Sequence, residues 1–189
     1  GRVMVGEWAV QPENLQVIRN FVGLVFQNPD NQIFMPTVWE DVAFGPMNLG
    51  LRGTELQKRV LQAMADVNID PEWYGHRSTE NLSGGEKKRI AIAGVLAMQP
   101  QILVLDEPSA QLDPRSRRQS IELLKSLPIT QLVATHDLDL VLELCDRTVV
   151  LSQGQIVYDG TTERVMGDAK FLLQHALEPP LSYSRPYCN

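Results

Sequence analysis

Cysteine, long apolar runs and an excess of positive charge are all scarce in this chain of 189 residues. The two cysteines, Cys145 and Cys188, are too few for a disulfide framework. No segment approaches the roughly 18 consecutive apolar residues of a membrane-spanning helix, so we expect a soluble, intracellular protein. Lys and Arg total 17 against 23 Asp and Glu, and the net charge of -6 argues against nucleic-acid binding through a basic surface.

The order of apolar patterns indicates an α/β protein with a largely parallel sheet. The length suits one domain of about 100–200 residues, and a hydrophobic content of 43% is enough for a core. Strand-like and helix-like segments alternate along the second half of the chain, which favours parallel strands. We expect strands at 1–8, 21–27, 101–106, 130–135, 147–152 and 155–159. We expect helices at 37–44, 54–68, 83–98, 114–127 and 137–144.

Residues 81–100 read NLSGGEKKRIAIAGVLAMQP and place two glycines directly after a serine. Ser83 suits the N-cap of a helix, and Gly84 and Gly85 leave the first backbone N–H groups bare. An anion can approach such a helix start closely, and the helix dipole favours it. An ordinary capped helix is the alternative, because Ser-Gly-Gly also occurs in plain turns. The charged run at 86–89 and the apolar strand that follows favour the anion site.

Residues 102–108 read ILVLDEP and deliver two adjacent carboxylates to the end of a buried strand. Ligands of open α/β sheets bind at the carboxyl ends of the strands. Asp106 suits coordination of Mg²⁺, and Glu107 could orient or deprotonate a water. A pair of solvated carboxylates at a strand end is the alternative.

Two more polar side chains follow predicted strands. His136 comes directly after the apolar segment QLVAT, at a strand-to-helix junction. A helix cap or a surface position is the alternative for this histidine. Gln27 ends a strand within VFQNPDNQIF, where its amide could reach a metal-bound water. A simple strand exit would have the same sequence.

In this order and spacing, the motifs resemble those of the nucleotide-binding subunits of ABC transporters. LSGGE is similar to the family signature, and it differs in Glu86, where glutamine is commoner. ILVLDEP resembles the Walker B strand with its catalytic glutamate, and SAQLD at 109–113 resembles the D-loop. His136 matches the switch histidine and Gln27 the Q-loop glutamine.

The stretch at 25–51 is similar to the energy-coupling factor group of importers for cobalt and vitamins, and the whole resemblance covers about residues 1–165. It implies a P-loop NTPase-like ABC ATPase fold with a mostly parallel sheet and a helical subdomain. The implied parts are core strands at 1–27, a helical subdomain at 28–98 that ends in the signature helix, a RecA-like ATPase core at 99–167 and a C-terminal tail at 168–189.

The resemblance also implies the chemistry of the site. Two subunits face head to tail, and ATP lies between the phosphate loop of one and the signature of the other. Glu107 would position the attacking water and His136 would contact the γ-phosphate, as the catalytic residues. Asp106 and Gln27 would help to hold Mg²⁺. The residues implied to bind nucleotide are Ser83, Gly84, Gly85, Glu86 and Asp113.

The partners implied by the resemblance are a second ATPase subunit, a transmembrane T-type coupling subunit and a substrate-binding S-type subunit. Nucleic acid is not among them. The protein would lie peripherally at the cytoplasmic face of the cell membrane. Cobalt, nickel and vitamins all remain open as the transported substrate, because a membrane subunit selects it.

The phosphate loop G-x-x-x-x-G-K-[ST] does not occur, and the sequence holds no Gly-Lys pair. The family places this loop upstream of the position where the sequence begins, so we expect an N-terminally truncated member. Such a polypeptide would not bind or hydrolyse ATP alone, and would at most present its signature to a partner's nucleotide. We also expect strand 101–106 to lack a neighbour and to form an exposed edge of the sheet.

Two other classes of protein compete with a transport ATPase. A non-transport ABC ATPase of DNA maintenance would usually carry coiled coils or a zinc-binding insertion, and this sequence shows neither heptads nor a cysteine cluster. A binding or regulatory module without catalysis would fit the missing phosphate loop.

Overall fold

A computed structural model describes residues 1–184, which fall into two compact units. The first unit is Gly1–Ala134, and the second begins at Thr135. Cys188 lies outside the described residues. The division of the sequence at residues 27, 98 and 167 stays a prediction.

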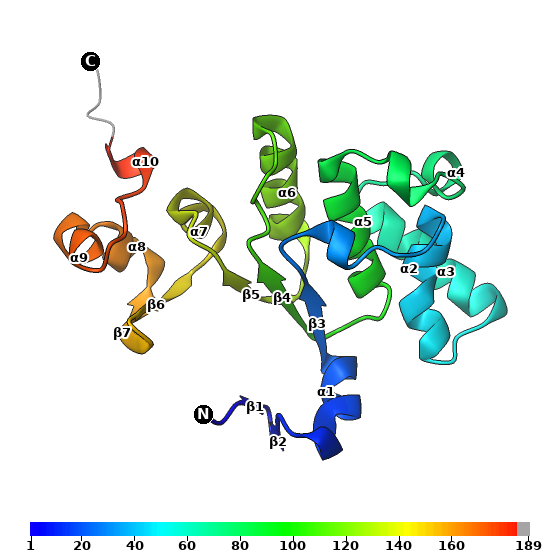
Figure 1. The fold of residues 1–189 in the computed structure, drawn as a ribbon, viewed down its shortest axis with the longest axis horizontal. Helices are drawn as coiled ribbons and strands as arrows, with labels where there is room; N and C mark the ends of the chain where they lie inside the picture. The colour runs from blue at the N-terminus through cyan, green and yellow to red at the C-terminus, as the bar shows by residue number, and fades with distance from the viewer. Residues whose placement is uncertain (185–189) are drawn as a thin grey trace. The chain divides into compact units, whose positions relative to one another are not determined.

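Three parallel strands form the sheet of the first unit, with β4 between β3 and β5 (Figure 1). The strands are β3 (Val22–Val25), β4 (Ile102–Asp106) and β5 (Thr130–Ala134). Val25 pairs with Leu105, and Leu105 pairs with Val133, so the carboxyl ends of all three strands lie at one edge. The predicted parallel arrangement is confirmed.

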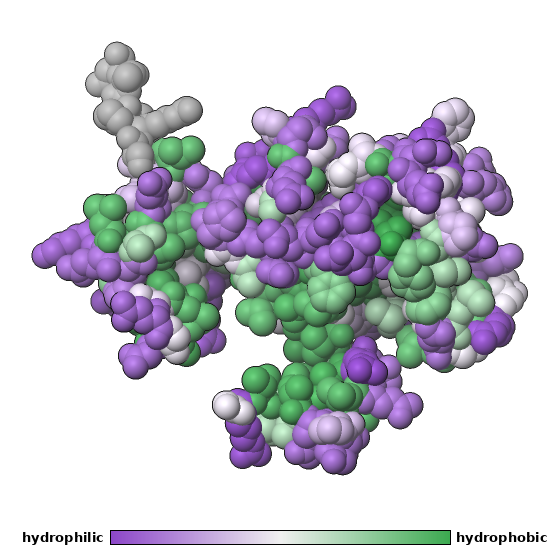
Figure 2. All heavy atoms as spheres, in the orientation of Figure 1, coloured by the Kyte–Doolittle hydropathy of each residue, from purple (hydrophilic) through white to green (hydrophobic). Residues whose placement is uncertain are grey.

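The expectation that residues 101–106 form an exposed edge is wrong. β4 has a hydrogen-bonded neighbour on each side, and its Leu105 is 0% exposed. Within residues 1–184 an outer strand of this sheet is β5, whose Leu132 is 62% exposed. Leu24, Val104 and Leu132 form one row across the sheet, and apolar residues gather over these strands in Figure 2. The apolar character of β5 therefore does not reflect burial within the described chain.

The segment between β3 and β4 is helical, as the sequence predicts for residues 28–98. Helix α2 starts at a capping box, because Thr37 and Glu40 each accept a hydrogen bond from the other's backbone N–H. Helices α2, α3 and α5 pack against one another around side chains such as Val42, Met64 and Ile92, which are fully buried. The elements are η2 (Pro29–Asn31), α2 (Val38–Asn48), α3 (Gly53–Asp66), α4 (Pro71–Tyr74), η3 (Thr79–Asn81) and α5 (Gly84–Leu96).

Gly23 allows α5 to lie directly on β3. A Cβ at this position would be 2.2 Å from Cγ1 of Val95 and 3.0 Å from Cγ of Pro100. Such distances are shorter than van der Waals contact, so only glycine lets the helix approach the strand this closely. The helical segment is thereby packed onto the sheet at the strand that leads to Gln27.

The first residues form a small hairpin and a helix rather than the single strand expected at 1–8. Gly6 turns the chain with φ of +57°, a left-handed value that favours glycine. The turn splits the expected strand into two antiparallel pieces. The elements before β3 are β1 (Met4–Val5), β2 (Trp8–Ala9), η1 (Pro12–Asn14) and α1 (Leu15–Phe21). Helix α6 (Pro114–Ser126) links β4 to β5.

The second unit combines an antiparallel hairpin with short helices. Its strands β6 and β7 turn at Gly154, where φ is +76°. A small core contains Val141, Val150 and Leu172, and the half-buried Cys145 packs against it. The elements are α7 (Leu138–Leu144), β6 (Arg147–Ser152), β7 (Gln155–Thr161), α8 (Thr162–Met166), α9 (Ala169–Gln174) and α10 (Leu181–Ser184). No helix in the described part of the chain is long and apolar enough to cross a membrane.

The different burial of Leu105 and Leu132 predicts unequal costs for two leucine substitutions. Leu105→Ala should lower the free energy of unfolding by about 2–5 kcal/mol, because it leaves a cavity in the core. Leu132→Ala, on the neighbouring strand, should cost less than about 1 kcal/mol because that side chain is largely exposed. Urea unfolding followed by tryptophan fluorescence measures both, since all three tryptophans lie in the first unit. Equal losses would contradict the burial of Leu105 and the exposure of Leu132.

Candidate functional site

Helix α5 begins at a serine cap that its own glutamate completes. Oγ of Ser83 accepts a hydrogen bond from the backbone N–H of Glu86 at 3.3 Å. In return, the backbone N–H and the hydroxyl of Ser83 both donate to Oε2 of Glu86, each at 2.7 Å. This capping box confirms Ser83 as the N-cap. The N–H groups of Gly84 and Gly85 belong to the first turn, where helix geometry supplies no partner within the helix.

The two glycines of the helix start have different surroundings. A Cβ added at Gly85 would be 2.7 Å from Oγ of Ser116, on α6. A Cβ added at Gly84 would meet no atom within 4 Å. Packing within the chain therefore requires glycine at position 85 but not at position 84. Gly84 leaves an open approach to the backbone at the helix start.

Glu86 faces its own helix start and not open solvent. The hydroxyl of Tyr74 donates to Oε1 of Glu86 at 2.7 Å, so both carboxylate oxygens have donors from the chain. Burial acts to raise the pKa of Glu86, but the hydrogen bonds from Tyr74 and Ser83 outweigh it and lower the pKa. The same contact raises the pKa of the Tyr74 phenol. The structure thus gives Glu86 a role in capping, while a role in binding nucleotide stays a prediction.

Lys88 carries a buried positive charge at the junction of α5 and two strand ends. Its side chain is 2% exposed. Nζ donates to the carbonyl oxygens of Phe26 at 3.2 Å, Gln27 at 2.8 Å and Glu107 at 3.5 Å. Burial lowers the pKa of Lys88, and the negative charges of Asp106 and Glu107 oppose that shift. Lys88 is therefore the cation next to the paired carboxylates of β4.

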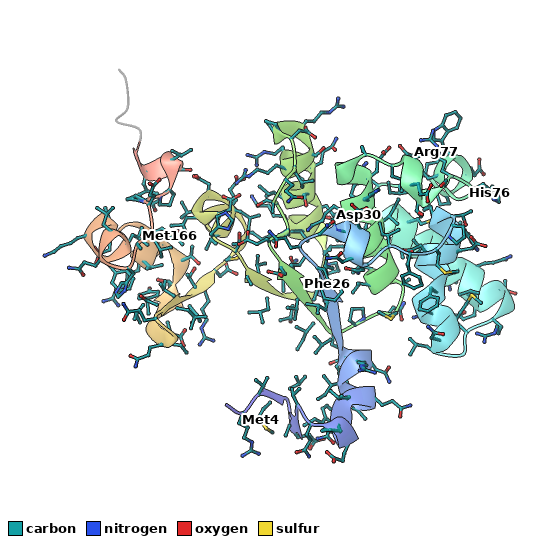
Figure 3. The ribbon with its side chains drawn as sticks, viewed as in Figure 1. Met4, Phe26, Asp30, His76, Arg77 and Met166 are labelled. Carbon is teal, nitrogen blue, oxygen red and sulfur yellow. The ribbon has the colours of Figure 1, made fainter. Side chains whose placement is uncertain are left out.

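The neighbours of Lys88 on α5 also bind within the chain. Nζ of Lys87 lies 2.6 Å from Oδ1 of Asp30, on the segment that leaves β3 and carries the labelled Phe26 and Asp30 in Figure 3. Nη1 of Arg89 donates to Gln119 of α6 at 3.3 Å. The side chains of Lys87, Lys88 and Arg89 therefore bind α5 to the segment after β3 and to α6.

The end of β4 forms a tight turn at the two carboxylates. Asp106 is the last residue of the strand and its side chain is exposed. Glu107 has φ of +44°, which is uncommon for a residue with a side chain and occurs often at functional sites. The backbone N–H of Glu107 donates to Ala134 at 2.8 Å, and its carbonyl accepts from Ala110 at 3.1 Å. These bonds hold the turn against the end of β5.

The structure brings together some of the predicted site residues. Gln27 is exposed and lies two residues beyond β3, and Lys88 joins its carbonyl to that of Glu107. Asp113 caps α6 by accepting from the N–H groups of the residues at 115 and 116. The hydrogen bond from the Ser116 hydroxyl is the main cause that lowers the pKa of Asp113. His136 is exposed in the second unit, between β5 and α7, and its role stays a prediction.

The sequence reasoning missed Lys88 as a residue of this junction. The signal was present, because Lys88 shares the buried face of α5 with Ile92 and Val95 at spacings of four and three residues. A lysine in register with buried aliphatic residues must find acceptors inside the protein, since Lys is almost never fully buried unless it is paired.

The parallel sheet, the glycine-rich helix start and the strand-end carboxylates define an ATP-binding cassette domain with the P-loop NTPase fold. The family model described as ABC transporter matches residues 1–110. The chain belongs to this family, whose members named below are ATP-binding subunits of ABC transporters.

Relatives and solved structures agree with this assignment. The chain is 55% identical over 185 residues to an ABC transporter ATP-binding protein of Gloeobacter violaceus, across 98% of this chain and 76% of that protein. It is 46% identical over 184 residues to the energy-coupling factor transporter ATP-binding protein EcfA of Methanoculleus marisnigri, across 95% of this chain and 66% of that protein.

Two solved structures share the fold. CbiO1 from Clostridium perfringens, part of the ABC transporter complex CbiONQ, matches with a TM-score of 0.80 at 38% identity, over 92% of this chain and 71% of that one. A dimeric ATP-binding cassette in a post-hydrolysis state, bound to ADP and Pi, matches with a TM-score of 0.71 at 29% identity, over 86% and 73% of the two chains.

The surroundings of the two glycines predict opposite effects of alanine. Gly85→Ala should lower the free energy of unfolding by about 1–3 kcal/mol, because the new methyl group collides with Ser116. Gly84→Ala should leave stability unchanged or raise it by up to about 1 kcal/mol, since alanine favours helix. Urea unfolding compares the two variants. A similar loss in both would contradict the packing at the helix start.

The Tyr74 contact predicts a pH-dependent contribution from Glu86. Because the folded pKa of Glu86 is lowered, its carboxylate stabilises the fold above the unfolded pKa, and this contribution is lost as the pH falls through the folded pKa. Tyr74→Phe should therefore raise the Glu86 pKa and cost more stability at neutral than at acidic pH. An NMR titration of the Glu86 carboxyl measures the shift. Tyr158→Phe removes a hydroxyl that bonds Thr161 in the second unit and should leave Glu86 unchanged.

Proposed function

We propose that the protein works as an ATP-hydrolysing subunit of an energy-coupling factor importer, of the type that takes up cobalt, nickel or vitamins. Its similarity to EcfA and to CbiO1 supports this subtype. In this role it would sit peripherally at the cytoplasmic face of the membrane and pair with a second ATPase subunit. A T-type coupling subunit and a substrate-binding S-type subunit would complete the transporter.

The open start of α5 carries the proposal. No contact within residues 1–184 requires glycine at position 84, yet Gly84 bares the backbone at the positive end of a helix dipole. A phosphate of a nucleotide held by a neighbouring subunit fits this opening, with Ser83 and the N–H groups of Gly84 and Gly85 as donors. Ser83 already donates its hydroxyl to Glu86, so contact with a phosphate would require this hydroxyl to change partner.

The strand ends supply the groups for hydrolysis. Asp106 and Gln27 would contribute oxygen ligands to Mg²⁺, and Glu107 would position the attacking water. Within residues 1–184 no group of three or more His, Cys, Asp and Glu side chains could hold a metal ion. Two protein oxygens fit Mg²⁺ nevertheless, because this ion commonly binds through one or two side chains together with substrate phosphates. His136 would contact the γ-phosphate.

The helical segment offers a surface for a transmembrane partner. Phe34 is 63% exposed and packs edge-on against Phe44, with ring centroids 4.7 Å apart. Met47, one turn further along α2, is also exposed. Exposed aromatic and methionine side chains are typical of protein interfaces. We propose that Phe34, Phe44 and Met47 contact the T-type subunit, because they lie on the helical segment that begins after Gln27.

Nucleotide capture would need a phosphate loop, which the 189 residues do not contain. The polypeptide alone should therefore show no Mg-dependent ATP turnover. The start of α5, which carries the signature residues, would then contact ATP that is bound by a second subunit.

This division of labour predicts nucleotide-dependent association with a second subunit. The labelled chain should bind a second EcfA subunit only in the presence of Mg·ATP. That EcfA subunit carries a phosphate loop, and its catalytic glutamate is replaced by glutamine so that ATP is not hydrolysed. Gly84→Leu should weaken this binding at least about tenfold, because the side chain would fill the approach to the helix start without disturbing the fold. Fluorescence anisotropy measures the dissociation constant.

Gln57→Leu on the exposed face of α3 is the matched control and should bind like the unchanged chain. Binding that is independent of nucleotide, or that Gly84→Leu leaves intact, would contradict the proposed use of the signature.

A further inference from the structure

The ammonium of Lys88 joins three segments that are far apart in the sequence. It lies on the second turn of α5, and its acceptors are the carbonyls of Phe26 and Gln27 after β3 and of Glu107 after β4. An ammonium group has three N–H donors and no acceptor. Three carbonyl oxygens around a side chain that is 2% exposed therefore match its full capacity for hydrogen bonding.

These contacts are made to backbone and not to side chains. Lys88 therefore fixes where the main chains of Gln27 and Glu107 lie without binding their side chains. The turn at Glu107 has a left-handed conformation that costs free energy unless its surroundings hold it. The bond from Lys88 and the bond to Ala134 restrain this residue through its carbonyl and its N–H.

We propose that Lys88 is a positioning residue, which holds the backbones of Gln27 and Glu107 to the signature helix. This inference rests on the proposed function, since it assigns Lys88 to the site where Glu107 would position the attacking water and Gln27 would help to hold Mg²⁺. A displacement of the start of α5 by a nucleotide is then passed to both residues through one side chain. The side chain of the neighbouring Lys87 forms an ion pair with Asp30 and serves as a comparison.

Amide hydrogen exchange in the 189-residue chain, measured by NMR without nucleotide, tests the inference. In Lys88→Met the side chain keeps its volume but loses its donors. The amides of Phe26, Glu107 and Ala110, which donate to Gln32, Ala134 and Glu107 respectively, should exchange about tenfold faster. The amides of Val60 and Met64 in α3 should keep their rates. Lys88→Gln, which retains two N–H donors, should restore part of the protection.

Lys87→Met should speed exchange only in the segment around Asp30 and leave Glu107 and Ala110 unchanged. The inference is overturned if Lys88→Met leaves the exchange of Glu107 and Ala110 unchanged. It is also overturned if exchange rises equally in α3, because Lys88 would then only stabilise the whole unit. If Lys88→Met does not fold, Lys88→Gln provides the test, through exchange at Glu107 and Ala110 compared with exchange at Val60 and Met64. No nucleotide enters the measurement, so its outcome is separate from that of the association assay.

Discussion

The buried ammonium of Lys88 is the interaction on which the junction of α5 with the ends of β3 and β4 depends. A charge that is removed from water must be satisfied by hydrogen bonds, and Lys88 finds them at the ends of β3 and β4. Gly23 brings the same two elements together, because its lack of a side chain lets Val95 of α5 lie against β3. Helix α5 is therefore tied both to the body of the sheet and to the edge where the strands end.

Gly85 and Gly84 differ in whether the fold requires glycine. The absence of a side chain at Gly85 is explained by Ser116, whose hydroxyl is fixed by Asp113. At Gly84 the surrounding space is open. Glu86 and Tyr74 complete the cap without covering this opening. The helix start is thus capped within the chain and still leaves the space around Gly84 open.

Much of the fold followed from local pattern, and the errors arose where local pattern carries no information. Ser83 and Thr37 were recognisable as caps because the residue three positions later is a glutamate in both cases. The place of β4 between β3 and β5 could not be predicted, since an apolar segment such as 101–106 does not reveal which strands lie beside it in a parallel sheet. The hairpin at Gly6 was missed because alternation continues across the turn.

The motifs of the candidate site could be predicted from the sequence, while the contacts of their residues could not. Glu107 was identified by its position after the strand, while its left-handed backbone became visible only in the structure. Lys87, Lys88 and Arg89 look alike in the sequence, and burial alone distinguishes the one that binds the strand ends. Glu86 appeared to be a ligand contact, and the structure shows that its carboxylate closes the helix cap.

The state of the Lys88 ammonium tests this account most directly. NMR of the lysine side-chain N–H groups, recorded on the chain at neutral pH, compares Lys88 with the exposed Lys58 of α3. The account predicts a Lys88 signal whose hydrogens exchange slowly and correlate through the hydrogen bond with the carbonyl carbon of Gln27. Hydrogens on Lys88 that exchange as fast as those of Lys58 would contradict it.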